Sequence, residues 1–357
     1  MMCQLTKAVL LAMVFALLIA CSAEPEGTSA LELSGEKVAQ KRAEVVVYSA
    51  RKEHLIKPLF DRYTEITDVP VSYVTDSAGP LLARLVAEGE QAQADLLMTV
   101  DAGNLWRAAE QGVLRSLTSE VLTANVPKNL RDVENRWFGL SVRARTIVYS
   151  SDRVTPEELS SYEALGEDQW RGRLCLRTAK KVYNQSLVAT LIAAHGEQAA
   201  EEFVKGWVAN LALAPFSNDT KVMEAIIAEQ CDIGIVNTYY FARLKNKNPE
   251  AALAIFWPNQ SGEAALGRGV HINISGAGVT SAASNPEGAQ ALLEWLVSEE
   301  AQQIFAALNH ERPVHPDIPP SAEVTAWGEF KADEIDVAEA GRRQAAAIML
   351  MDRASYH

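Results

Sequence analysis

The sequence predicts an α/β fold with two lobes, and two observations support this. Strand-like apolar runs alternate with amphipathic helical runs, which is the pattern of parallel βαβ units. Beyond an apolar leader and a polar stretch, about 315 residues remain, more than one hydrophobic core usually supports. We therefore expect two lobes joined by crossing strands, with a ligand cleft between them.

The first part of the chain alternates strands and helices. Residues 44–49, 69–74 and 94–100 are rich in β-branched and other apolar residues, as strands are. Between them, residues 54–67 and 79–90 carry apolar side chains at i, i+3 and i+4, which predicts two helices packed on one face.

A second set of elements follows residue 142. Short apolar runs predict strands at residues 173–177, 232–236 and 269–276. Helical spacing predicts helices at residues 186–194, 199–211, 221–229, 286–308 and 337–351. We expect the N-terminal lobe to comprise residues 44–140 and 272–312, and the C-terminal lobe residues 141–271 and 313–357.

The N-terminus has the pattern of an export signal. The apolar run at residues 8–20 is shorter than the roughly 20 residues that span a bilayer, and it fits the apolar region of a signal peptide. The Leu-Ile-Ala-Cys sequence ending at Cys21 resembles the lipobox of bacterial lipoproteins. We expect residues 1–20 to be a signal peptide, Cys21 to carry lipid and residues 21–43 to form a tether at the periplasmic face of the membrane. The alternative is an ordinary signal peptide in which Cys21 has no role.

The charge of the chain argues against nucleic acid as a partner. The formal net charge is −13, whereas nucleic-acid binding depends on Lys and Arg neutralising phosphates. This charge says little about what a small internal site binds.

Two cysteines, Cys175 and Cys231, lie outside the leader region. In an exported protein such a pair suggests a disulfide, and the alternative is two buried thiols. The sequence contains no Gly-x-Ser-x-Gly, no Gly-rich phosphate loop and no His-Glu-x-x-His, so we do not expect an enzyme.

A tyrosine pair, Tyr239 and Tyr240, follows the strand predicted at residues 232–236 and precedes a helical run. Within a strand two neighbouring side chains would point to opposite faces. At a junction between strand and helix both can turn toward one point. The alternative is that both are structural tyrosines whose hydroxyls bond to neighbours.

Longer motifs elsewhere in the chain favour a functional role for the tyrosine pair. The sequence resembles the ferric-iron-binding proteins of ABC-type iron uptake over nearly the whole mature chain. The similarity lies in residues 48–51, 97–101, 105–107, 139–145, 182–189, 237–240, 257–260 and 267–276. It implies a two-lobed periplasmic binding protein of type II-like fold, monomeric, that delivers Fe³⁺ to an ABC-type permease in the inner membrane. In that family a tyrosine of the Tyr-Asn-Gln-Ser segment joins the pair in holding the metal, which implies Tyr183, Tyr239 and Tyr240 as ligands.

The chemistry of phenol agrees with this implied ligand. Fe³⁺ is a hard cation that prefers anionic oxygen donors. Phenol has a pKa near 10, so the tyrosines are protonated at neutral pH and the cation must displace their protons. Three phenolates would offset the three positive charges of the ion.

The sequence departs from part of the family after Arg51. Lys52 and Glu53 stand where some members have His-Tyr, which supplies a further metal donor there. In this chain the group that takes the place of that donor is therefore left open. Glu53 could supply a carboxylate oxygen, or a small anion such as carbonate could bridge metal and protein, held by Arg51 and Arg143. The simpler interpretation of Glu53 is a solvated residue of a first helical turn.

Several other residues have two interpretations. Arg145 and Arg243 could hydrogen-bond a ligand phenolate or pair with a carboxylate, whereas His271 and Tyr48 are expected to be structural. A rival hypothesis keeps the fold but exchanges the iron for an organic or oxyanion solute such as thiamine, a polyamine or phosphonate. The tyrosines would then be stacking walls, and Arg51 and Arg143 would clamp the anion.

Overall fold

The computed structural model describes residues 44–262 and 264–357. The predicted signal peptide (residues 1–20), the predicted lipidation site Cys21 and the predicted tether (residues 21–43) lie outside the described residues. Within the described part, none of the helices combines the length and apolar character needed to cross a membrane.

The N-terminal βαβ units form the first part of the sheet, as the alternation predicts. Strand β1 (Val45–Ser49) lies between β2 (Val71–Thr75) and β3 (Leu96–Thr99) and is parallel to both. Helices α1 (Lys57–Thr67) and α2 (Ala78–Glu88) make the two connections.

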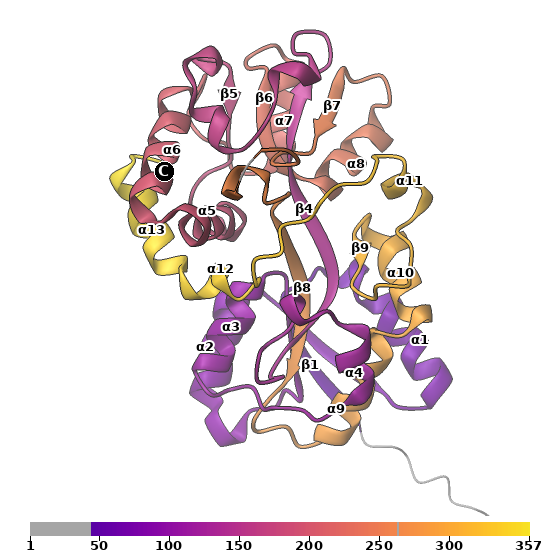
Figure 1. Ribbon diagram of the computed structural model, residues 1–357. Coiled ribbons are helices and arrows are strands. Elements are labelled where there is room, and N and C mark those ends of the chain that lie inside the picture. The colour runs from indigo at the N-terminus through magenta and orange to yellow at the C-terminus, as the bar shows by residue number, and fades with distance from the viewer. Residues whose placement is uncertain (1–43, 263) are drawn as a thin grey trace, which may run out of the picture. The chain divides into compact units, whose positions relative to one another are not determined.

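Two longer strands, β4 (Phe138–Ser150) and β8 (Ile272–Val279), connect the two parts of the sheet (Figure 1). The first half of β4 pairs antiparallel with β8, and its second half pairs antiparallel with β6 (Ile233–Asn237) and β7 (Leu253–Phe256). All thirteen residues of β4 are buried, so neither an apolar alternation nor an exposed face marks this strand in the sequence. One strand thus belongs to both parts of the sheet.

The sheet order is β2-β1-β3-β8-β4-β6-β5, with β7 and β9 pairing to β4. The remaining strands are β5 (Leu174–Cys175) and β9 (Arg312–Pro313). The remaining α-helices are α3 (Ala102–Glu110), α4 (Glu120–Asn125), α5 (Val182–His195), α6 (Glu197–Ala209), α7 (Asp219–Ile227), α8 (Thr238–Lys247), α9 (Pro286–Leu296), α10 (Glu299–Asn309), α11 (Ala322–Thr325), α12 (Glu339–Arg342) and α13 (Gln344–Arg353).

Separate hydrophobic cores lie at the two ends of β4. One core packs α1 to α4, α9 and α10 on the first part of the sheet. At the other end, one cluster packs α5, α6 and α13, and a second packs α7 and α8. The lobe limits expected from the sequence stay a prediction. Strand β4 runs through the expected limit at residue 140, and Val314 and Val337 pack into the first core.

One long helix expected at residues 286–308 is two helices, α9 and α10. Ser298 separates them, and its side chain accepts a hydrogen bond from the backbone N–H of Ala301 at 3.4 Å. Serine is favoured at this capping position because its oxygen satisfies a free N–H of the first turn. Apolar spacing continues across the break, and for that reason the pattern predicted one helix.

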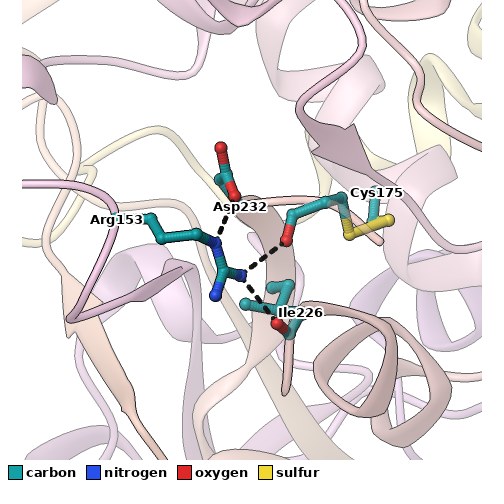
Figure 2. The surroundings of a disulfide bond; sticks show 5 residues. Arg153, Cys175, Ile226 and Asp232 are labelled. Carbon is teal, nitrogen blue, oxygen red and sulfur yellow. Dashed lines mark hydrogen bonds and ion pairs between the residues drawn. A yellow bond between two sulfur atoms is a disulfide. The ribbon is translucent and has the colours of Figure 1, made fainter. Parts of the chain in front are cut away.

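Cys175 in β5 and Cys231, just before β6, are joined by a disulfide with their Cα atoms 6.0 Å apart. Figure 2 shows Arg153 beside this bond. Its guanidinium donates to the carbonyl oxygens of Ile226 and Cys231 at 2.8 and 3.1 Å and to Asp232 Oδ1 at 2.7 Å. Disulfide and guanidinium together fix the turn that leads into β6.

The disulfide spans 56 residues of chain, and cross-linking a loop of this length restricts the unfolded state. We expect Cys175→Ala with Cys231→Ala to lower the free energy of unfolding by about 3–4 kcal/mol in denaturant titration. Reductant should destabilise the parent protein and leave the double variant unaffected. Equal stability of the oxidised parent and the variant would contradict this expectation.

Candidate functional site

A cavity of about 140 Å³ is lined by Arg143 of β4 and by residues of elements that pack at the two ends of this strand, among them α5, α8 and α10. The structure brings together six of the predicted site residues there. These are Arg51, Arg143, Tyr183, Tyr239, Tyr240 and Arg243.

The three tyrosines of this cavity lie in the first turns of two helices. Tyr183 is the second residue of α5, and Tyr239 and Tyr240 are the second and third residues of α8. The strand β6 ends immediately before α8, so the two adjacent rings share one side, with centroids 4.5 Å apart. A helix N-terminus carries partial positive charge, which favours a negative group such as a phenolate.

Burial dominates the acid–base properties of two of these phenols, Tyr239 and Tyr183. It raises the pKa of Tyr239 well above the ordinary value, and the neighbouring phenols of Tyr183 and Tyr240 raise it further, while Arg143 opposes the shift. Burial also raises the pKa of Tyr183, again against Arg143. Tyr183 and Tyr239 are therefore protonated at neutral pH, and each must lose a proton before its oxygen can bind a cation as phenolate.

Guanidinium groups surround the rings. The Cζ atoms of Arg143 and Arg177 lie 5.3 and 5.0 Å from the centroid of Tyr183. Arg243 lies over Tyr239 at 5.1 Å and is held by a hydrogen bond to Asn309. Such contacts are favourable with neutral rings, and the positive charge also stabilises a phenolate.

Arg51 has buried donors that are not satisfied. Its Nη1 donates to Glu311 at 3.1 Å, to Ser141 at 3.4 Å and to Ser275. Its Nε and Nη2 have no hydrogen-bond partner among residues 44–262 and 264–357, although the side chain is 2 % exposed. A buried donor without a partner is costly, so an anion that reached these two nitrogens would be stabilised.

Arg145 lies behind the cavity and does not line it. It forms an ion pair with Asp219 at 3.1 Å and donates to Asn184 at 3.1 Å and to Asn237 at 3.2 Å. Asn237 in turn donates from Nδ2 to the hydroxyl of Tyr239 at 3.2 Å. Arg145 therefore orients the phenol through an asparagine.

Glu53 lies away from the cavity in this structure. Its side chain is exposed and accepts a hydrogen bond from the hydroxyl of Tyr73 at 3.0 Å. Glu53 as a metal ligand therefore stays a prediction.

Tyr48 and His271 lie outside the cavity lining. Tyr48 is buried in the first core with its hydroxyl 3.1 Å from Glu88. His271 is buried near Thr190, and burial together with nearby arginines lowers its pKa well below the ordinary value.

The sequence reasoning missed Glu311 and Arg177. Glu311 is buried at the cavity, and although burial raises the pKa of this carboxyl, Arg51 and Ser141 outweigh that effect and lower it. Its partner Arg51 lies 260 residues away, so no local pattern could have indicated the pair. Arg177 stood inside an expected strand, and its contact with the ring of Tyr183 depends on the fold.

The oxygen donors gathered here suit a hard cation. Three phenols converge with buried arginine donors that can hold an anion beside them. In the described part of the chain, no group of three or more His, Cys, Asp or Glu gathers in a way that could hold a metal ion.

Comparison with known proteins gives the family. Residues 58–332 match the family described as bacterial extracellular solute-binding protein. The chain belongs to this family. The prediction of a two-lobed α/β binding fold and of a resemblance to ferric iron-binding periplasmic proteins is confirmed.

Relatives of this solute-binding protein include proteins named for iron. Iron uptake protein A1 of Synechocystis sp. is 39 % identical over 346 residues, which cover 95 % of this chain and 93 % of that protein. A Trichodesmium structure in complex with iron and citrate ligands is 42 % identical, covers 88 % of this chain and all of that one, and superposes with a TM-score of 0.83. The ferric iron-binding protein A of Mannheimia haemolytica, in an open conformation, is 35 % identical, with coverages of 88 % and 99 % and a TM-score of 0.81.

Proposed function

We propose that this solute-binding protein captures Fe³⁺ outside the cytoplasm on the phenolates of Tyr183, Tyr239 and Tyr240 and delivers it to an ABC-type permease. The observation that carries the proposal is the convergence of three phenols, on two helix N-termini, in one cavity. The cavity volume of about 140 Å³ suits an ion with a small anion. Pockets for organic ligands are usually several hundred Å³, which disfavours the rival organic solute.

A small oxyanion such as carbonate completes the coordination in this proposal. The free Nε and Nη2 of Arg51 support it, because a guanidinium edge binds a planar oxyanion through two parallel hydrogen bonds. Arg143 and Arg243 supply further positive charge at the same cavity. Glu53 remains a second candidate donor, and it would have to leave Tyr73 to reach the metal.

The proposal includes the predicted route to the membrane. Export through a signal peptide, lipid on Cys21 and a tether would hold a monomeric binding protein at the periplasmic face, close to the permease. The apolar leader and the Leu-Ile-Ala-Cys sequence support this arrangement.

Replacing both tyrosines of the pair tests the ligand set. We expect iron from ferric citrate to give the parent protein a visible phenolate-to-iron charge-transfer band. Tyr239→Phe with Tyr240→Phe should remove most of that band and weaken iron binding by more than about 100-fold, since even residues behind a metal ligand contribute 10–100-fold. The control is Tyr149→Phe, which removes a phenol buried elsewhere in β4. An unchanged band and affinity in the double variant would show that the site is wrongly assigned.

Proton release tests the protonation of the ligands. Because burial raises the pKa of Tyr183 and Tyr239, both are protonated in the iron-free protein, so iron binding releases their protons and affinity falls as pH falls. With saturating ferric citrate in a pH-stat, Tyr183→Phe should release about one proton fewer per iron bound than the parent protein does. Equal release from both proteins would exclude Tyr183 as a phenolate ligand.

The dependence of iron binding on bicarbonate tests the anion. In carbonate-free buffer, added bicarbonate should tighten iron binding by the parent protein. Arg51→Lys should lose most of this dependence, because lysine keeps the charge facing Glu311 but has no planar fork. An iron affinity of the parent protein that is the same with and without bicarbonate would contradict the expectation. The matched control is Arg84→Lys, at an arginine that pairs with Glu88 away from the cavity.

A further inference from the structure

A buried carboxylate, Asp219, lies behind the tyrosine cavity and does not line it. It is the first residue of α7, and its side chain is fully buried. Helices α7 and α8 pack on the same hydrophobic cluster at one end of β4 (Figure 1). The carboxylate therefore belongs to the element that packs beside the helix of the tyrosine pair.

Three donors converge on the two oxygens of this carboxylate. Arg145 Nη1 and the backbone N–H of Asn237 donate to Oδ2 of Asp219 at 3.1 and 3.0 Å. Arg177 Nη1 donates to Oδ1 at 3.3 Å. Because both oxygens are engaged, one side chain fixes two guanidinium groups and the residue that precedes α8.

The first arginine leads from Asp219 to two of the tyrosines. Arg145 donates to the side-chain oxygens of Asn184 and Asn237 at 3.1 and 3.2 Å. Asn184 directly follows Tyr183 in α5, and Asn237 donates to the hydroxyl of Tyr239 at 3.2 Å. The position of Arg145 therefore affects both helix N-termini that carry the phenols.

The second arginine reaches the remaining tyrosine. The Cζ of Arg177 lies 5.0 Å from the ring centroid of Tyr183. Burial lowers the pKa of Arg177, but Asp219 and then Tyr240 outweigh burial and raise it, so the guanidinium lies close to both groups. Arg177 thus connects Asp219 with Tyr183 and Tyr240.

Asp219 is the carboxylate that the two arginines share. Within residues 44–262 and 264–357, neither Arg145 nor Arg177 forms an ion pair with another carboxylate. Both arginines are buried, and a buried charge that loses its partner is strongly unfavourable. A neutral residue in place of Asp219 would therefore force the two guanidinium groups to find new positions.

A buried aspartate can also serve the fold alone, and the chain offers such a case for comparison. Asp132, which precedes β4, accepts hydrogen bonds from Nε of Arg136 at 2.6 Å and from the backbone N–H groups of Glu134 and Arg136 at 3.2 Å. It is buried as Asp219 is, but neither it nor Arg136 lines the tyrosine cavity. The two aspartates differ in what their arginines contact.

We infer that Asp219 is a positioning residue that holds the three tyrosines in one arrangement through Arg145 and Arg177. The inference rests on the proposed iron function and adds to it a residue outside the cavity lining. Three phenolates must reach the same ion, so a ring that rotates away lengthens its bond to iron. Groups that orient metal ligands from behind typically contribute 10–100-fold to metal affinity.

The test replaces the carboxylate by its neutral isostere in the full chain, loaded from ferric citrate. In Asp219→Asn the iron affinity, measured by equilibrium dialysis against citrate, should fall about 10–100-fold. The two arginines would then face the phenolates without a counter-charge and stabilise the electrons on their oxygens. The phenolate-to-iron charge-transfer band should therefore move to shorter wavelength.

The matched control is Asp132→Asn. It removes a buried carboxylate of the same kind, so it should lower the free energy of unfolding while the iron affinity and the band stay as in the parent protein. A loss of affinity with a shifted band in this control as well would assign the effect of Asp219→Asn to general destabilisation and overturn the inference.

A second variant, Arg177→Gln, keeps the test decisive if Asp219→Asn does not fold. It removes positive charge beside the phenolates, so the band should move to longer wavelength, opposite to the shift in Asp219→Asn, and the affinity should fall. The two substitutions together should cost less affinity than the product of the two single effects, because the carboxylate acts partly through this arginine. Purely multiplicative effects, or an unchanged band in Arg177→Gln, would overturn the inference.

The outcomes separate this inference from the proposed function. If the parent protein gives no charge-transfer band with ferric citrate, the iron function fails and the role of Asp219 fails with it. If the parent protein gives the band and Asp219→Asn keeps both the band and the affinity, only the role of Asp219 is overturned.

Discussion

Strand β4 is the constraint on which the rest of the site depends. Alternate residues of a strand share a face, so Ser141, Arg143 and Arg145 point to the same side. Ser141 forms hydrogen bonds with both members of the Arg51–Glu311 ion pair, and Arg143 lies against the ring of Tyr183. Arg145 donates hydrogen bonds to Asn184 and Asn237, which neighbour the tyrosines in sequence. Because β4 pairs with strands of both parts of the sheet, this face aligns groups from both hydrophobic cores. A shift of one residue in register would turn all three side chains away.

The charges around this face leave Tyr183 and Tyr239 protonated and still provide positive charge beside them. Burial raises the pKa of Tyr183 and Tyr239, and Arg143 works against that effect. Asp219 offsets Arg145 and Arg177 from behind, and Glu311 offsets Arg51. These two phenols therefore stay neutral without a metal, while enough positive charge remains for a phenolate–metal unit with an anion. Fully paired arginines would leave no donor for that anion, and the free edge of Arg51 fits this requirement.

The sequence predicted the parts of the fold and site that depend on local patterns. The βαβ alternation and the turn at Tyr239 and Tyr240 both follow from neighbouring residues, and the structure has both. Patterns failed where distant contacts decide. Glu311 owes its place to Arg51, 260 residues earlier, and β4 has no exposed face to mark it. The break at Ser298 is a different case, because its capping is local and the apolar spacing that continues across it concealed the break.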